Sequence, residues 1–557
     1  MKFSEMPYRR IEEDEIREFF DRLIEDSKKA KSGEEAFLLH KKYYDFTGDV
    51  FTNLILGKFR HDIDTSEEFY LKENDHIDEI TPLLSKYITD YQQVLYDSPY
   101  RAYLEEEISK VAFKNIELAR LSIDDKILPL MQEENALISS YNKLIASANI
   151  PFNGEELNIS LLRKYLTDKD RDTRKGAWKA LSDYFLSVTD EIDDIFDKLV
   201  KNRTRQAKEL GYDNFVELGY NRMNRNAYRR AEVEGFRKEV KEHFVPLVTR
   251  IQEQRREKLG VADLKYYDNE MFFKEGNPAP IGTPEEIMKA GQEMYKELSP
   301  ETAEFFDFMI ENEMFDVLGR KTKKAGGYMN YLPKYKAPFI FANFNGTSSD
   351  VDVITHECGH AFQGYITRDD EIIEHNDLTM ETAEIHSMSM EYFTYGWMDK
   401  FFGERAEDYR WMHIRDSVTF LPYGCMVDEF QHIIYDQPDL TPKERKQVWK
   451  DLESQYRPWL DFDSDPFFSE GGFWQKQGHL FWNPFYYIDY VLASVEAMQF
   501  KVWMDKDFDE AWQHYLKLCK LSVSKFYEEE LSEVGLKSPF AEGTVRDLAR
   551  DFSAKIF

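Results

Sequence analysis

Hydrophobic residues recur along most of the chain at intervals of three and four, the spacing that places them on one face of an α-helix. In the segment 11–135 this spacing begins with Ile16, Phe19 and Leu23. It returns over residues 161–259 after a short interruption. The pattern predicts a protein that is almost entirely helical, with a small β element where the pattern breaks.

Segments rich in glycine, proline and asparagine mark those breaks. Residues 276–282 lead into Thr283-Pro284-Glu285-Glu286, a capping box with proline at the first helical position, which predicts the start of a helix. Phe339-Ile340-Phe341-Ala342 predicts a strand, and Asn345-Gly346 predicts its turn. Turn-forming residues between positions 140 and 163 predict a short hairpin.

The charge balance and the cysteine count narrow the class of protein. The net charge of −32 disfavours nucleic acid and anionic membranes as partners. The first residues, Met1 to Glu5, lack the apolar stretch of a signal peptide, and no apolar run is long enough to span a bilayer. Three cysteines are too few for a disulfide framework. We therefore expect a cytoplasmic protein without nucleic-acid or membrane partners.

The segment His356-Glu357-Cys358-Gly359-His360 carries candidate metal chemistry. Residues four apart on a helix project from one face, so both imidazoles can reach one metal ion at about 2.0–2.1 Å. Glu357 is rotated about 100° from His356, so it can stand beside the metal and accept a proton from a bound water. Cys358 falls on the apolar face, where we expect it in the core rather than at the metal.

A third ligand is expected from a second helix. A metzincin would need Gly and His at the positions of Gln363 and Ile366, so that class is excluded. The remaining common arrangement takes a carboxylate from another helix. Glu381, Glu384 and Glu391 lie in an otherwise apolar stretch and share one helical face. Each histidine should donate its other ring N–H to an acceptor, for which Asp352 and Glu391 are the candidates.

These motifs resemble a known family. Residues His356 to Gly364 and Met380 to Tyr392 are closely similar to segments of the thimet oligopeptidase and oligoendopeptidase F family of zinc peptidases, nearest to its bacterial Pz-peptidase and oligoendopeptidase F branch. The similarity extends to Gly478–Tyr490 and, more loosely, to the chain from about residue 140 onward.

The resemblance implies the third ligand. The family places it on a Glu that precedes another Glu by seven residues, and Glu384 and Glu391 have this spacing. It therefore implies one zinc ion held by His356, His360 and Glu384, with Glu381 as the alternative ligand.

The resemblance also implies residues that contact the substrate. The family uses a His and several Tyr near its C-terminus for the peptide and its developing oxyanion. Here these are His479, Tyr486 and Tyr490, with Tyr487 as a further substrate contact. Independently of the family, Gly326-Gly327-Tyr328 is expected to form an edge strand that pairs with the peptide backbone, because glycine permits close approach.

The implied fold is a mostly helical, clam-like body of two lobes with the active site deep in a channel. We expect an N-terminal helical lobe at 1–185 and a catalytic zinc-peptidase domain at 186–557. The implied function is a zinc-dependent endopeptidase that hydrolyses internal bonds of short oligopeptides, because a folded protein cannot enter the channel.

Two other functions remain open at this point. Glu357 with His360 and Glu429 with His432 both have the spacing found in di-iron carboxylate bundles, although that interpretation leaves His356 unused. A helical protein of this kind could also bind peptides without cleaving them. The presence of two histidine ligands and a base favours the peptidase.

Overall fold

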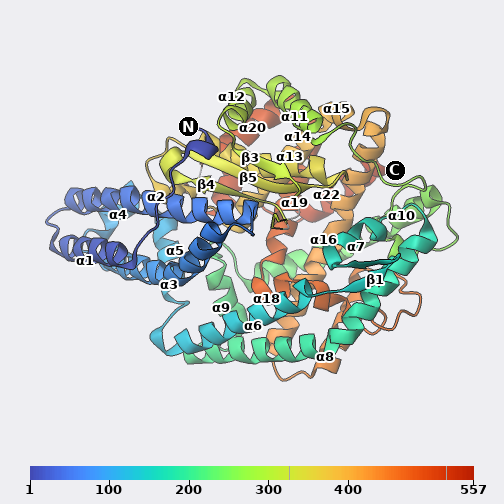
Figure 1. Cartoon of the computed structure of the whole chain (residues 1–557), viewed down its shortest axis with the longest axis horizontal. Helices are drawn as coiled ribbons and strands as arrows, with labels where there is room; N and C mark the ends of the chain where they lie inside the picture. Colours follow the sequence, from blue (N-terminus) through green and yellow to red (C-terminus); the bar gives the residue numbers. More distant parts are fainter. Residues whose placement is uncertain (321, 325, 522–523) are drawn as a thin grey trace. The chain divides into compact units, whose positions relative to one another are not determined.

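The computed structural model describes residues 1–557 except 321, 325 and 522–523 (Figure 1). The described chain is mostly α-helical, with one two-stranded and one three-stranded sheet, which confirms the predicted fold class. It divides into two compact units, each assembled from three separate stretches. The first unit comprises Met1–Arg120, Ala279–Ala406 and Ala497–Leu536; the second comprises Leu121–Pro278, Glu407–Glu496 and Lys537–Phe557.

The first unit combines N-terminal helices with the helices and strands around the candidate metal motif. Its helices are α1 (Glu13–Lys29), α2 (Gly33–Ile63), α3 (Glu68–Tyr96), α4 (Arg101–Glu107), α5 (Lys110–Arg120), α11 (Pro284–Leu298), α12 (Pro300–Glu311), α13 (Ser349–Ile366), α14 (Met380–Phe393), α15 (Met398–Phe402), α20 (Phe508–Leu521) and α21 (Tyr527–Glu533). Its strands are β3 (Phe315–Leu318), β4 (Tyr328–Leu332) and β5 (Ala337–Phe344). As predicted, α11 begins at Pro284, and the Thr283 side chain accepts a hydrogen bond from the Glu286 backbone N–H.

The second unit is also helical apart from one hairpin. Its elements are α6 (Leu128–Ala146), β1 (Ile150–Phe152), β2 (Glu155–Leu157), α7 (Ile159–Leu166), α8 (Arg171–Glu209), α9 (Phe215–Arg222), α10 (Arg230–Leu259), α17 (Pro442–Tyr456), α18 (His479–Trp482) and α22 (Thr544–Ile556). The antiparallel pair β1–β2 is the hairpin predicted between positions 140 and 163, and it turns through Asn153 and Gly154 at positive φ. Two of the passages of the chain between the units fall inside helices, at the start of α16 (Ala406–Asp436) and within α19 (Tyr487–Met504).

The unit boundaries differ from the division expected at residue 185. That position lies inside α8, a continuous helix, and both units contain stretches from distant parts of the chain. The division into 1–185 and 186–557 stays a prediction. Among the helices of the described residues, none has both the length and the apolar character that crossing a bilayer requires.

The last strand of the three-stranded sheet, β5, directly precedes α13, the helix that carries the candidate metal motif. β5 is the central strand of this sheet, parallel to β3 and antiparallel to β4 (Figure 1). Residues 337–342 of β5 are all buried, which explains their uninterrupted apolar sequence. The turn after β5 is tied to the first turn of α13, because the Asp350 carboxylate accepts from the backbone N–H groups of Asn345 and Gly346, both at 2.8 Å.

Helices α13 and α14 cross with their backbones in contact at Gly359. A Cβ atom at this position would lie 2.5 Å from the Ser387 Cα and 2.6 Å from the His386 carbonyl oxygen, closer than a side chain can approach. The preceding residue of α13, Cys358, is fully buried in the core, as predicted. Gly359 therefore sets the separation of the two helices that carry the candidate ligands.

We expect Gly359→Ala to force α13 and α14 apart. The added methyl group must be accommodated against backbone atoms, which cannot rotate away as a flexible side chain can, so the free energy of unfolding should fall by about 1–3 kcal/mol. Denaturant unfolding and a zinc-binding titration measure the two consequences, lower stability and weaker metal binding.

Gly235→Ala in α10 provides the matched control. No atom lies within 4 Å of a Cβ built there, and the position is exposed. This substitution should leave stability unchanged or raise it by up to about 1 kcal/mol, since alanine is the better helix former. Equal effects of the two substitutions would show that the crossing at Gly359 does not limit stability.

Candidate metal centre

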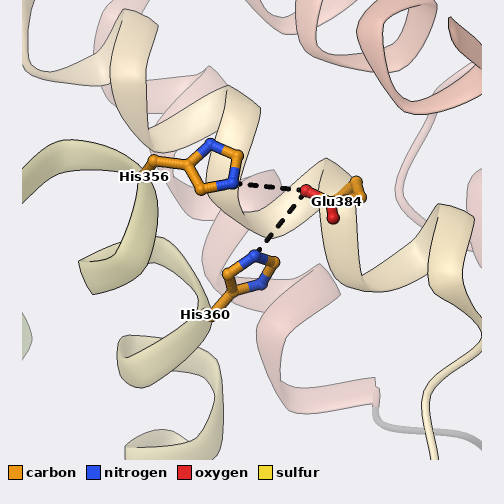
Figure 2. Close-up of side chains that lie close together, drawn as sticks. All are labelled: His356, His360 and Glu384. Carbon is orange, nitrogen blue, oxygen red and sulfur yellow. Dashed lines mark ion pairs between the residues drawn. The ribbon is translucent and has the colours of Figure 1, made fainter. Parts of the chain in front are cut away.

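Two histidines from α13 and one glutamate from α14 converge in the first unit. His356 and His360 project from the same face of α13 toward Glu384 (Figure 2). The Nε2 atoms of His356 and His360 lie 3.4 Å and 3.6 Å from the same oxygen, Glu384 Oε2. One ligand atom from each residue falls within 4.8 Å of the others.

This geometry fits a zinc ion. Ligand atoms bound at 2.0–2.1 Å to a tetrahedral ion lie about 3.4 Å from one another. The two measured nitrogen–oxygen distances agree with that separation, and two imidazoles with one carboxylate suit zinc among the divalent metals. Glu381 lies one turn earlier on α14, where its charge acts on the buried Glu530.

The electrostatics of the three groups favour an ionised carboxylate. Burial tends to raise the pKa of Glu384, but the hydrogen bond from His356 and the charges of both histidines lower it to about 2. Burial lowers the pKa of His360. Burial also tends to lower the pKa of His356. There the carboxylates of Glu384 and Glu391 outweigh the effect of burial and hold the pKa of His356 well above its ordinary value.

Further contacts orient the three side chains. The Nδ1–H of His356 donates to Glu391 Oε1 at 2.7 Å, which leaves Nε2 directed at Glu384 and confirms Glu391 as its expected acceptor. The backbone of Ala383 acts against the effect of burial at His360 and raises the pKa of that ring. The expectation that Asp352 also accepts from a ligand histidine stays a prediction.

The sequence did not reveal Ser387, whose hydroxyl donates to Glu384 Oε2 at 2.9 Å. Its place three residues after Glu384, on the same helical face, is the signal that could have identified it. Glu357, the expected base, is half-buried next to His356, and its charge acts on the pKa of His360.

The Gly326-Gly327-Tyr328 segment does lead into a strand at the edge of the described sheet. A Cβ at Gly327 would lie 3.3 Å from the Phe341 carbonyl oxygen, so this glycine allows close approach of β5. The Tyr328 hydroxyl donates to Asp62 of α2 at 2.8 Å, and its ring stacks on Phe59. The side chain of Tyr328 thus contacts α2, so we expect a peptide to pair with the backbone of the strand rather than with this side chain. Pairing with substrate at Gly327 and Tyr328 stays a prediction.

The predicted aromatic residues near the C-terminus form one cluster in the second unit. The ring centroid of His479 lies 5.0 Å from that of Tyr487, 5.9 Å from Tyr486 and 6.0 Å from Tyr490. Pro484 separates α18 from α19 and Phe485 has a positive φ of 71°, so the cluster spans a bend rather than one helix. The structure brings these four residues together, and their contact with substrate stays a prediction.

The two residues of the second E-x-x-H motif are engaged in other contacts. His432 is buried and its Nε2 lies 3.0 Å from the Tyr220 hydroxyl. Glu429 accepts hydrogen bonds from Tyr456 and Lys241. These contacts explain the presence of both residues by their hydrogen bonds within the protein, so neither residue requires an iron site to account for it.

A pair of helix-borne histidines that meets a glutamate from a neighbouring helix, in a mostly helical protein, is typical of the zinc metallopeptidases. Comparison with family models specifies the class further. Residues 164–549 match the model of peptidase family M3, and residues 3–123 match that of the peptidase M3 N-terminal domain. The chain therefore belongs to peptidase family M3.

Curated relatives are distant in sequence. The chain is 22% identical over 395 residues to an oligoendopeptidase F homolog of Lactococcus lactis subsp. lactis (strain IL1403), with 67% of this chain and 61% of that protein aligned. It is 22% identical over 311 residues to the group B oligopeptidase PepB of Streptococcus agalactiae serotype III (strain NEM316), with 54% and 50% aligned. The chain thus spans between half and two thirds of the length of these relatives.

Solved structures are more similar. The structure titled Pz peptidase A with inhibitor 2 has a TM-score of 0.94 and 44% identity, and the alignment covers 100% of this chain and 99% of that one. A putative oligoendopeptidase F from Bacillus anthracis str. Ames has a TM-score of 0.89 and 41% identity, with 100% and 98% covered. The similarity over the whole length confirms the expected relationship to the Pz-peptidase and oligoendopeptidase F branch.

Three substitutions separate the roles of the carboxylates on α14. Glu384→Ala removes the expected carboxylate ligand and should abolish tight zinc binding. Glu391→Gln leaves the shape intact but removes the charge that orients His356, so zinc affinity should fall by about 10–100-fold. A competition titration with a chromogenic chelator measures each affinity.

Glu381→Ala is the comparison variant from the same helix, since the charge of Glu381 acts on Glu530. Its zinc affinity should stay within a few-fold of the unsubstituted protein. A larger loss of affinity in Glu381→Ala than in Glu384→Ala would identify Glu381 as the ligand.

Proposed function

We propose that the protein is a zinc-dependent endopeptidase that hydrolyses internal peptide bonds of short oligopeptides. The observation that carries the proposal is the convergence of His356, His360 and Glu384, with distances that fit zinc, directly beside Glu357. Membership of peptidase family M3 and the oligopeptidase names of its relatives support the same function. The expected partners are therefore oligopeptides, and the expected cofactor is a single zinc ion per chain.

In this proposal His356, His360 and Glu384 hold the zinc ion. When bound, zinc would supply Lewis acidity that lowers the pKa of a water and polarises the scissile carbonyl. Glu357 accepts the proton of the attacking water and then delivers it to the leaving amine, as a general base and then a general acid. Glu391 holds the Nδ1 proton of His356, and Ser387 orients the Glu384 carboxylate.

The remaining residues would bind the peptide and stabilise its transition state. His479, Tyr486 and Tyr490 carry hydrogen-bond donors suited to the oxyanion that develops on the scissile carbonyl. Tyr487 would contribute a further contact, and the backbone at Gly327 and Tyr328 would pair with an extended peptide. A cytoplasmic location is the accompanying prediction, and it follows from the sequence.

The substitution Glu357→Gln tests the proposed base. The amide preserves the shape but cannot accept the proton, so turnover should fall by about 10²–10⁴-fold while zinc binding is retained. Cleavage of an internally quenched peptide and elemental analysis of the same preparation measure both properties. Near-normal turnover would remove Glu357 from the mechanism, and full activity after exhaustive chelation would exclude zinc chemistry.

A series of peptides tests the substrate class. We propose an enclosed active site, so peptides of up to roughly twenty residues, which span at most about 70 Å when extended, should be cleaved efficiently. A native globular protein that displays the same cleavage sequence in an exposed loop should resist, because it cannot enter. Mass spectrometry of the products gives both rates. Equal rates for the folded protein and the short peptide would place the chemistry in an open cleft.

A further inference from the structure

The side-chain amide of Gln477 forms hydrogen bonds with two residues of the second unit, Tyr423 and His479, which belong to different helices. The Tyr423 hydroxyl of α16 donates to Gln477 Oε1 at 2.7 Å. Gln477 Nε2 lies 2.9 Å from Nδ1 of His479 at the start of α18. Both distances are normal for hydrogen bonds, and they join a half-buried tyrosine to the histidine that the proposed function directs at the substrate.

The donors and acceptors around this amide determine its orientation. Burial raises the pKa of Tyr423 well above its ordinary value, so its hydroxyl remains a donor and requires an acceptor. The amide oxygen of Gln477 meets that requirement, which places the amide nitrogen beside His479. Burial raises the pKa of the neighbouring Tyr487 phenol, and Gln477 acts against that rise. The reversed amide would direct an N–H at the Tyr423 hydroxyl and leave that phenol without its acceptor.

This orientation decides which nitrogen of His479 carries the proton. An N–H group of Gln477 directed at Nδ1 needs a lone pair there, so the neutral ring is protonated at Nε2. We propose that Gln477 is a positioning residue that holds His479 as the Nε2–H tautomer, and that it thereby keeps turnover independent of the ionisation of this ring. Neither residue is a zinc ligand, and Gln477 acts through His479.

The surroundings of His479 are compatible with a neutral ring. Burial lowers the pKa of His479. The titratable groups that face it are the phenols of Tyr486, Tyr487 and Tyr490. The charged groups on the surrounding elements include Arg457, over the rings of Tyr423 and Phe473, and Lys476, over the rings of Phe473 and Trp178.

The consequence is a hydrogen-bond donor that persists across the pH range. The neutral ring donates through Nε2–H, and the protonated ring, which forms at low pH, carries the same Nε2–H. The inference rests on the proposed function, in which His479 donates to the peptide or its oxyanion. A histidine without this control would present a lone pair at Nε2 in part of the population and would lose that donor.

The substitution Gln477→Glu keeps the shape of the side chain but should favour the opposite tautomer of His479. The carboxylate accepts from Nδ1–H, so the neutral ring presents a lone pair at Nε2, and the pKa of the ring rises because the negative charge favours imidazolium. Below that pKa the imidazolium still donates, and the ratio of variant to unsubstituted kcat should be near one. Above it the ratio should fall by about 10²-fold, as for the loss of one oxyanion donor, with KM changing little.

Tyr423→Phe gives an intermediate variant. It removes the hydroxyl that orients the amide, so both amide orientations become available and kcat should fall by less than about tenfold. The inference would be overturned if the ratio of Gln477→Glu kcat to unsubstituted kcat stayed constant with pH. A purely structural loss lowers kcat equally at every pH, whereas a change of tautomer lowers it only above the pKa of the ring.

Nuclear magnetic resonance of the zinc-loaded enzyme tests the tautomer directly. Long-range nitrogen–proton correlation on protein with ¹⁵N-labelled histidine distinguishes the two tautomers, and the His479→Ala spectrum identifies the signals of His479. The unsubstituted enzyme should show the Nε2–H form and Gln477→Glu the Nδ1–H form. An Nδ1–H ring in the unsubstituted enzyme would by itself overturn the inference. The inference would also be overturned if Gln477→Glu showed the Nδ1–H tautomer but had unchanged kinetics. Failure of the proposed function would be distinct, since no peptide cleavage would then depend on zinc in the unsubstituted enzyme.

Discussion

The contact between α13 and α14 at Gly359 is the constraint on which the candidate metal centre depends. Two helices with side chains at their contact stay 8–10 Å apart, and a glycine allows the backbones to come closer. At this crossing the His386 carbonyl and the Ser387 Cα occupy the space of a missing side chain. His356 lies three residues before Gly359 and His360 directly after it, and their ring nitrogens meet Glu384 at distances suited to a single ion.

The protein's own contacts hold these candidate ligands in place. Glu391 fixes the ring of His356, and Ser387 fixes the carboxylate of Glu384. Both come from α14, so the helix that supplies one ligand also orients another. Rigid elements position chemical groups more accurately than loops, and here ligands and supporting residues alike lie on two adjoining helices.

Much of this arrangement could be predicted from the sequence, for identifiable physical reasons. The spacing of His356 and His360 is a local property of one helix, and the capping residues before α11 report the start of a helix in the same way. The choice of Glu384 depended on similarity to a family, since several carboxylates of α14 share a face. Ser387 and Gln477 were not predicted because their roles depend on which residues face them after folding. The two units could not be predicted either, because no local pattern reports that distant stretches pack together.

The discontinuous first unit has a consequence for synthesis on the ribosome. The candidate ligands of α13 and α14 leave the exit tunnel more than a hundred residues before α20, whose Tyr515 donates to the His386 carbonyl at 2.9 Å, at the helix crossing itself. Until that segment emerges, the nascent chain displays two histidines and a glutamate on helices that lack part of their packing. The helix crossing can therefore reach its final packing only after α20 has been synthesised, which makes the candidate metal centre a late product of folding.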